Sequence, residues 1–223
     1  MHIVDSLGRP NTPIKITGQA DFTALAVDPN GGLHIAWLDP QPGNIWTVHY
    51  ASYSGDPAIL DSGAVLPADD VVGVIHLPAD HLLLGFALGI DARNTYIIWS
   101  DSNNAGSDSP AIVYALTFTS DKLNEVKQIT VGDSMRSFSS VLTLNDHTVV
   151  VALVASPTNS APAVAFLVNG KTARIDTFSA PFAEFFHGPS LSLQADGSLQ
   201  IQWSVWTSNQ GEIMYSATTR AFP

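Results

Sequence analysis

Residues 25–39 read LAVDPNGGLHIAWLD, and this stretch predicts the fold of the chain. Two runs of alternating apolar residues flank a polar turn, and Asn30-Gly31 supplies the positive-φ positions of a tight turn. The stretch therefore predicts a β-hairpin. The same pattern recurs as LGIDARNTYIIWSD (88–101), LTLNDHTVVVALVAS (142–156) and LSLQADGSLQIQWSVW (191–206). The recurrence predicts four repeats of about 50 to 60 residues each.

Further strands follow each hairpin, and aromatic residues mark equivalent positions in them. The third strands align on Tyr50, Tyr114, Phe166 and Tyr215. The second strands align on Trp37, Trp99 and Trp203, with Ala152 in the third repeat. Fourth strands are expected at residues 63–68 (GAVLPA), 125–130 (EVKQIT) and 173–178 (ARIDTF). Residues 66–84 are expected to connect the first two repeats, with room for an extra strand.

The sequence predicts an all-β, four-bladed β-propeller that forms a single domain over residues 1–223. The expected blades span residues 22–66, 85–130, 138–179 and 188–220. The last blade lacks a fourth strand, and residues 13–18 (PIKITG) are similar to the fourth strand at 125–130. We therefore expect residues 13–18 to pair into the last blade and close the ring, because closure removes exposed sheet edges. A β-sandwich has the same composition and is the alternative architecture.

Composition excludes several classes of function. The chain has 223 residues, 45% of them hydrophobic, and a formal net charge of −11, which argues against nucleic acid and anionic membrane surfaces as partners. It has no cysteine, so disulfides and thiol chemistry are excluded. No apolar run is long enough for a membrane span, and the first residues lack a signal-peptide pattern. We expect an extracellular or cell-surface location if the sequence is a trimmed piece, and a cytoplasmic one otherwise.

The repeat resembles that of the sialidase-type (BNR-like) β-propellers. The residues that carry the resemblance are Val27, Asp28, Gly31, Leu33 and Trp37 in the first repeat, and Asp196, Gly197, Leu199 and Trp203 in the last. The stricter Asp-box, Ser-x-Asp-x-Gly-x-Thr-Trp, is not matched. A sialidase also needs three arginines around the carboxylate of its substrate, and Arg136 is the one arginine on the expected ligand-binding face. The resemblance therefore implies the propeller fold without sialidase activity.

Ligands of a propeller usually bind where the segments leading into the first strands meet the loops between the second and third strands. Each leading segment carries one acid; these are Asp21, Asp80, Asp133 and Glu184. A ring of carboxylates at the channel mouth would favour Ca²⁺, Na⁺ or a basic ligand. The alternative is that the four acids only solvate surface loops. Residues 101–106 (DSNNAG) begin like a calcium-binding loop, but Ala105 and Ile112 occupy ligand positions, which favours a polar loop.

Other candidate ligand-binding residues lie near the same face. Trp46 and Trp206 are placed beside the second-to-third-strand loops, where aromatic rings stack on sugars or mark protein contacts. His81 and His187 lie beside acids and are candidate acid–base groups or metal ligands. The alternative for each histidine is a structural role, and for Trp206 it is packing on a neighbouring blade.

Three functions are compatible with these residues. The first is a non-catalytic module that binds a glycan or a protein through the loop face. The second is a glycoside hydrolase that uses two carboxylates, Asp133 and Glu184, whose separation would decide the mechanism. The third is a structural or interaction domain of a larger surface protein. Oligomeric state and ligand identity do not follow from the sequence.

Overall fold

The computed structural model describes residues 21–28, 30–53, 70–103, 111–119, 126–145, 148–155, 161–179 and 185–220. These residues form strands and turns with no helix among them, so this part of the chain holds no helix that could cross a membrane. The chain divides into two compact units, Met1–His76 (unit 1) and Leu77–Pro223 (unit 2). The closing strand expected at residues 13–18 lies outside the described residues, and the single domain stays a prediction.

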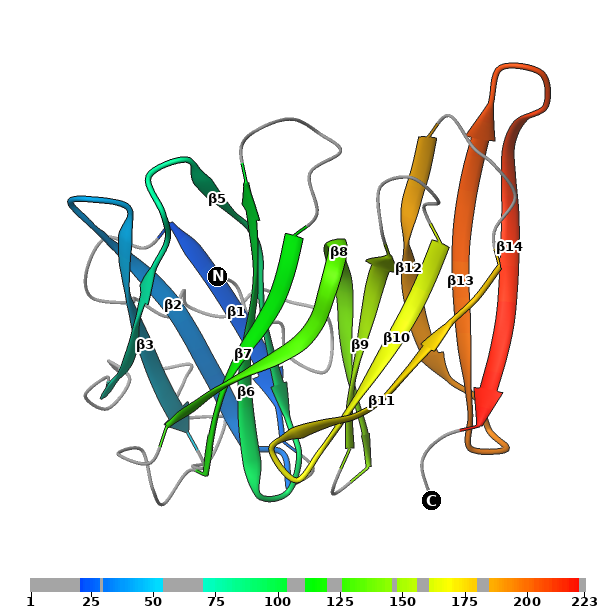
Figure 1. The fold of residues 1–223 in the computed structure, drawn as a ribbon. Helices are drawn as coiled ribbons and strands as arrows, with labels where there is room; N and C mark the ends of the chain where they lie inside the picture. Colours follow the sequence, from blue (N-terminus) through cyan, green and yellow to red (C-terminus); the bar gives the residue numbers. More distant parts are fainter. Residues whose placement is uncertain are drawn as a thin grey trace, which may run out of the picture. The chain divides into compact units, whose positions relative to one another are not determined.

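Unit 1 holds one antiparallel sheet in the order β1-β2-β3-β4 (Figure 1). Its strands are β1 (Phe22–Val27), β2 (Leu33–Gln41), β3 (Ile45–Tyr53) and β4 (Asp70–His76). The strand next to β3 at the edge of this sheet is β4, which lies within the segment where we expected a connection between repeats. The strand expected at residues 63–68 lies outside the described residues.

Unit 2 holds two antiparallel sheets, of seven and three strands. The larger has the order β11-β10-β9-β8-β7-β6-β5, and the smaller has the order β12-β13-β14. Their strands are β5 (His81–Ile90), β6 (Asn94–Asn103), β7 (Ala111–Thr119), β8 (Lys127–Asn145), β9 (Thr148–Ala155), β10 (Ala161–Val168), β11 (Lys171–Thr177), β12 (Phe185–Leu193), β13 (Ser198–Thr207) and β14 (Gly211–Arg220).

Strand β8 belongs to two repeats at once. It has 19 residues. Its first half, residues 127–135, pairs with β7, and its second half, residues 135–145, pairs with β9. Met135 lies at the change of partner, opposite both Ala111 and Ala155. The seven-stranded sheet thus consists of two four-stranded repeats that share one continuous strand. With β1–β4 and β12–β14, the described strands form four antiparallel repeats of three or four strands.

The first strands of successive repeats in unit 2 lie side by side. Thr143 of β8 donates its hydroxyl to the carbonyl oxygen of Ile90 at the end of β5 (2.6 Å). Gly89 permits this approach, because a Cβ atom there would lie 2.6 Å from a methyl carbon of Val149. On the other side, Ser140 Oγ lies 3.4 Å from the carbonyl oxygen of Pro189 in β12. Adjacent first strands make the fold propeller-like, while ring closure and the blade count stay predictions.

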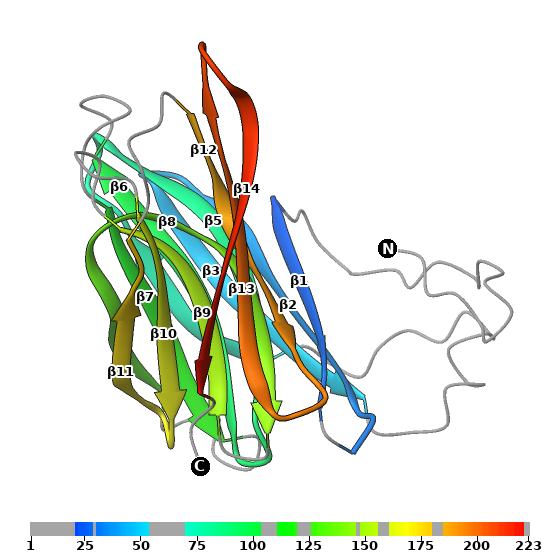
Figure 2. The same cartoon turned by 90° about the vertical axis from the view of Figure 1, so that its right-hand side faces the viewer.

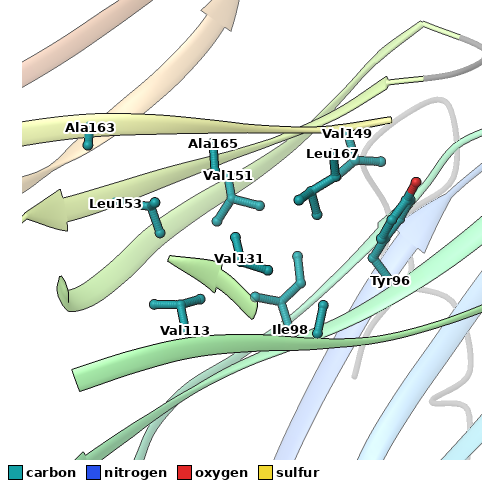
Figure 3. Close-up of a cluster of buried hydrophobic side chains, with 11 residues drawn as sticks. Tyr96, Ile98, Val113, Val131, Val149, Val151, Leu153, Ala163, Ala165 and Leu167 are labelled. Carbon is teal, nitrogen blue, oxygen red and sulfur yellow. The ribbon is translucent and has the colours of Figure 1, made fainter. Parts of the chain in front are cut away.

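Within unit 2, alternate side chains of neighbouring repeats pack on one another and form the core. Figure 3 shows Ile98 and Val113 of the second repeat facing Val151 and Leu153 of the third, with Val131 of β8 between them. The opposite face of the third repeat packs on the fourth through a second cluster. This cluster contains Val150, Val164, Phe166, Leu199, Ile201, Trp203 and Val205, all buried. The third repeat is therefore buried on both faces.

The expected tryptophan positions are confirmed in the first, second and fourth repeats, and the equivalent position in the third repeat is shifted by one residue. Trp37, Trp99 and Trp203 are buried and lie opposite His49, Tyr114 and Tyr215. The ring centroids of these pairs are 5.2, 5.6 and 5.8 Å apart. In the third repeat the equivalent residue is Leu153, which faces the second repeat. The alignment on Ala152 was wrong, because Ala152 lies opposite Val164 and faces the fourth repeat.

Two of the aligned third-strand aromatics also occupy other positions. Tyr50 lies opposite Ala36, so the partner of Trp37 is the preceding residue, His49. Phe166 lies opposite Val150, and the guanidinium carbon of Arg174 lies 4.1 Å from its ring centroid. Because side chains alternate between faces, a shift of one residue moves a side chain to the opposite face of the sheet.

We expect Leu153→Ala to destabilise the protein by about 2–5 kcal/mol, because the substitution leaves a cavity between two repeats. The matched control is Leu193→Ala, since Leu193 is 46% exposed and should cost less than about 1 kcal/mol. Urea unfolding followed by tryptophan fluorescence measures both. Equal losses in the two variants would contradict the placement of Leu153 at the interface between repeats.

Candidate functional site

A histidine and an aspartate meet at one end of the β5–β6 pair. Nδ1 of His81 lies 2.6 Å from Oδ1 of Asp101, and the two side chains are 27% and 13% exposed. Antiparallel pairing brings them together, because Leu83 lies opposite Asp101 and His81 lies opposite Asn103. A carboxylate at Nδ1 fixes the tautomer and orientation of the ring, as in sites where a histidine moves a proton or holds a ligand. Asp80 lies in the preceding turn and is exposed.

Sequence reasoning selected His81 but missed its partner. Asp101 was assigned to a polar loop, whereas residues 101–103 complete strand β6. The signal was present in the hairpin itself, since the first residues of one strand must lie opposite the last residues of the next.

For three further candidates the structure gives the position along a strand. Asp133 and Arg136 lie in β8 on either side of Met135, at the end of the sheet where β7 begins and β9 ends. His187 lies in β12 opposite Ser204. Glu184 lies outside the described residues. The use of these four residues in ligand binding or catalysis stays a prediction.

Two further candidates, Asp21 and Trp46, lie in unit 1. Asp21 is exposed, and its backbone N–H donates to the carbonyl oxygen of Leu38 (3.1 Å). Trp46 lies within β3, opposite Pro40 and Ile75, and is half-buried. Its indole nitrogen is buried without a hydrogen-bond partner in the described part of the chain. Trp46 is therefore less available for stacking than its position beside a loop suggested.

The expected ring of carboxylates stays a prediction, because the side chains of Asp133 and Glu184 lie outside the described part of the chain. Within the described ranges, no three His, Asp or Glu side chains are close enough to hold a metal ion. The proposal of Ca²⁺ or Na⁺ at a central channel stays a prediction.

The smallest sheet carries a neutral polar surface, which we call the polar face. Its odd-numbered residues on β13 and β14 pack on the third repeat, so its even-numbered residues point away. Ser190, Gln202 and Ser216 form one row across the three strands, and Ser192, Gln200 and Thr218 form the next. All are exposed except Gln200, which is half-buried. Apart from Glu212 and Arg220 at the two ends of β14, the described side chains of this face carry no charge.

Side-chain hydrogen bonds order part of the polar face. The amide nitrogen of Gln194 lies 3.1 Å from Ser192 Oγ and 2.9 Å from Oε1 of Gln200. At the other end, Ser204 donates its hydroxyl to Glu212 (2.6 Å). Trp206 lies opposite Glu212 and is 36% exposed, and the neighbouring Met214 is 67% exposed. Trp206 thus lies at one end of a surface formed by hydroxyl and amide side chains.

A partly buried network of polar groups lies at the first hairpin of unit 1. Asp28 accepts hydrogen bonds from the backbone N–H groups of Asn30 (2.7 Å) and Gly32 (2.9 Å). Its other oxygen lies 3.0 Å from Nε2 of His34, whose Nδ1 lies 2.5 Å from the hydroxyl of Tyr50. Burial raises the pKa of Asp28, but these hydrogen bonds lower it more, so the net pKa lies below its usual range.

The equivalent aspartate of the second repeat has the same role. Asp91 accepts from the backbone N–H groups of Arg93 (2.7 Å) and Asn94 (2.6 Å) and from the hydroxyl of Tyr96 (3.0 Å). The Tyr96 hydroxyl also accepts from the N–H of Gly170 (2.9 Å). Burial and the Asp91 carboxylate hold the pKa of Tyr96 above its usual range. The repeated aspartates therefore stabilise turns, and we assign them no ligand.

Comparison with known proteins supports the fold. No family model and no curated protein matches the chain. Among solved structures, the chain is similar to a protein of unknown function from Dyadobacter fermentans DSM 18053 (TM-score 0.51, 13% identity). It is also similar to a xylan β-1,4-xylosidase from Bacillus halodurans C-125 (TM-score 0.50, 12% identity). An endo-arabinase from Bacteroides thetaiotaomicron VPI-5482 gives a TM-score of 0.46 at 12% identity.

The three alignments cover 96%, 94% and 96% of this chain, but 64%, 42% and 80% of the other chains. This chain therefore spans less than two thirds of the first two structures. At these identities the likeness concerns the fold alone. None of the three descriptions names a sialidase, so the sialidase-type resemblance is supported only as far as an all-β, propeller-like fold.

We expect Asp28→Asn to destabilise the protein by about 1–2 kcal/mol at neutral pH, because the charged carboxylate accepts three hydrogen bonds. Since the folded-state pKa of Asp28 lies below the ordinary aspartate value of 3.8, this contribution is complete above that pH and disappears as pH falls through the folded-state pKa. Urea unfolding at neutral and acidic pH measures the difference between wild type and variant. Asp80→Asn, at an exposed turn, is the control and should change little at either pH. A difference that does not shrink in acid would contradict the assignment.

Proposed function

We propose that the chain is a non-catalytic module that binds a neutral glycan. The observation that carries the proposal is the polar face of β12–β14, with Trp206 at one end. Sugars present hydroxyl groups around their rims and C–H groups on their ring faces. Hydroxyl and amide side chains can bond the former, and an exposed aromatic ring can stack on the latter.

The composition of the polar face supports a ligand in place of a packed sheet. The two interfaces through which the repeats of unit 2 pack are formed by Val, Leu, Ile, Ala and aromatic residues. Burying Ser and Gln side chains against such residues would leave hydrogen-bonding groups without partners, which is costly. Amide and hydroxyl groups are instead suited to water or to a polar ligand.

Among the residues that the sequence selected, Trp206 lies on the polar face, and His187 lies in β12 of the same sheet. The loop face with Asp21, Asp80, His81, Asp133, Arg136, Glu184 and His187 remains the alternative location of the site. A closed four-bladed ring remains the alternative arrangement, because a neighbouring blade would then cover the polar face. A protein ligand is the alternative to a glycan for the polar face. Glycoside hydrolysis by Asp133 and Glu184 is the alternative for the loop face, and the His81–Asp101 contact would suit proton transfer there.

We expect the protein to bind at least one neutral polysaccharide on an array of plant and bacterial glycans, without release of reducing sugar. Trp206→Ala should weaken that binding roughly tenfold, because one aromatic contact contributes about 1–1.5 kcal/mol. Gln202→Ala should weaken it less. Isothermal titration calorimetry with the best glycan measures both.

The control variant is Leu82→Ala, which removes an exposed apolar side chain from a different strand, β5. It should bind like wild type. Binding that is insensitive to Trp206→Ala and Gln202→Ala would move the site away from the polar face. Release of reducing sugar, abolished by Asp133→Ala or Glu184→Ala, would replace the proposal with the hydrolase.

A further inference from the structure

The outer edges of the described sheets differ in how they are protected. An exposed, regular edge strand can pair with another chain, and proteins commonly prevent this with bulges, charges or proline. Edge strands β4, β5, β11 and β12 each show a register shift against their neighbour. Strand β11 also carries Lys171 and Arg174.

Strand β14 has neither a bulge nor a proline, and its two charged residues, Glu212 and Arg220, lie near its ends. It pairs with β13 from Gly211 to Arg220 without a register shift, and it is the last strand of its sheet (Figures 1 and 2). Its sequence, GEIMYSATTR, contains no proline and no lysine. The other regular edge among the described strands, β1, has 6 residues against 10 in β14. Strand β14 is thus the longest regular edge in the described part of the chain.

The charges of β14 are arranged symmetrically about Ser216. Glu212 and Arg220 lie four residues before and after it, on the same face of the strand, and both are exposed. If two copies of β14 paired antiparallel around Ser216, each Glu212 would lie opposite an Arg220 of the other copy. Met214 would lie opposite Thr218. Opposite charges at directly paired positions stabilise a strand pair, and like charges destabilise it.

We propose that β14 is a dimer interface, at which it pairs antiparallel with β14 of a second copy of this chain, centred on Ser216. The pairing joins two three-stranded sheets into one of six strands. The carbonyl oxygen of Arg220 already accepts from Nη2 of Arg174 (3.1 Å), so the shared pairing ends at Arg220.

The dimer would also extend the candidate glycan surface. Residues directly opposite each other in antiparallel strands point to the same side of the sheet. The two polar faces would therefore be continuous across the Ser216 pair. If the proposed glycan binding holds, one long polysaccharide could contact both copies, and this consequence alone rests on that function.

The other occupant of this edge is the segment 13–18 of the same chain, expected from the sequence as a closing strand. That segment has six residues, whereas a second β14 matches nine positions, 212–220. A closing strand would leave the protein monomeric, so the mass in solution distinguishes the two.

Sedimentation velocity of the full chain over a wide range of concentration tests the interface. We expect a dimer for wild type, and Glu212→Arg or Arg220→Glu alone should weaken dimerisation about tenfold, because each places like charges opposite each other at two positions. The double variant Glu212→Arg with Arg220→Glu should restore the dimer. Lys171→Glu, on the outer strand β11, is the charge-reversal control and should dimerise like wild type.

A cysteine at the centre of the interface gives a second, independent readout. The chain has no cysteine of its own. Opposed residues of antiparallel strands have Cα atoms about 4.5–5.5 Å apart, which is within the range that a disulfide spans. Ser216→Cys should therefore form a covalent dimer on mild oxidation, while Ser192→Cys, on the same face but in edge strand β12, should not. A wild-type monomer at all concentrations, or equal cross-linking of both variants, would overturn the proposal.

Discussion

Unit 2 depends on the contact between first strands of successive repeats. The hydroxyl of Thr143 holds β8 to the end of β5, and the absence of a side chain at Gly89 leaves room for Val149 beside it. Once the first strands are adjacent, the faces of the second and third strands must meet, and their apolar side chains fill the space between repeats. The turns that join the first and second strands also need a fixed geometry. Asp28 in unit 1 and Asp91 in unit 2 provide it by accepting backbone hydrogen bonds.

The hairpins and their tryptophans could be predicted from the sequence because apolar and polar residues alternate clearly there. The phase of the third repeat could not. Its second strand reads TVVVALVA, and it is buried on both faces, so no alternation indicates which residues face which neighbour. The sequence alignment therefore placed Ala152, in place of Leu153, at the position equivalent to the tryptophans. An extra strand was expected within residues 66–84, but its place in the first sheet was not, because this segment was expected to connect two repeats, whereas Asp70–His76 pairs with β3.

The candidate site was only partly predictable, because strand pairing decides which residues meet. His81 was selected for its position beside an acid, but its partner is Asp101 on the next strand and not Asp80. The polar face could have been found from the sequence. Ser and Gln alternate with Leu and Ile along residues 190–202, a pattern typical of a sheet with one wet side. A criterion based on charged and aromatic residues in loops does not detect neutral polar residues that alternate along a strand.

Strand β8 has a consequence for how such a chain can change in evolution. Most neighbouring units of a repeat protein are joined by loops, where segments can be inserted, deleted or exchanged. Between the second and third repeats there is instead a continuous hydrogen-bonded strand, and Met135 is paired on both sides. Neither the second nor the third repeat can be duplicated, lost or exchanged without breaking a strand of the other repeat. These two repeats should therefore be inherited as one block of seven strands, with recombination confined to the loops around it.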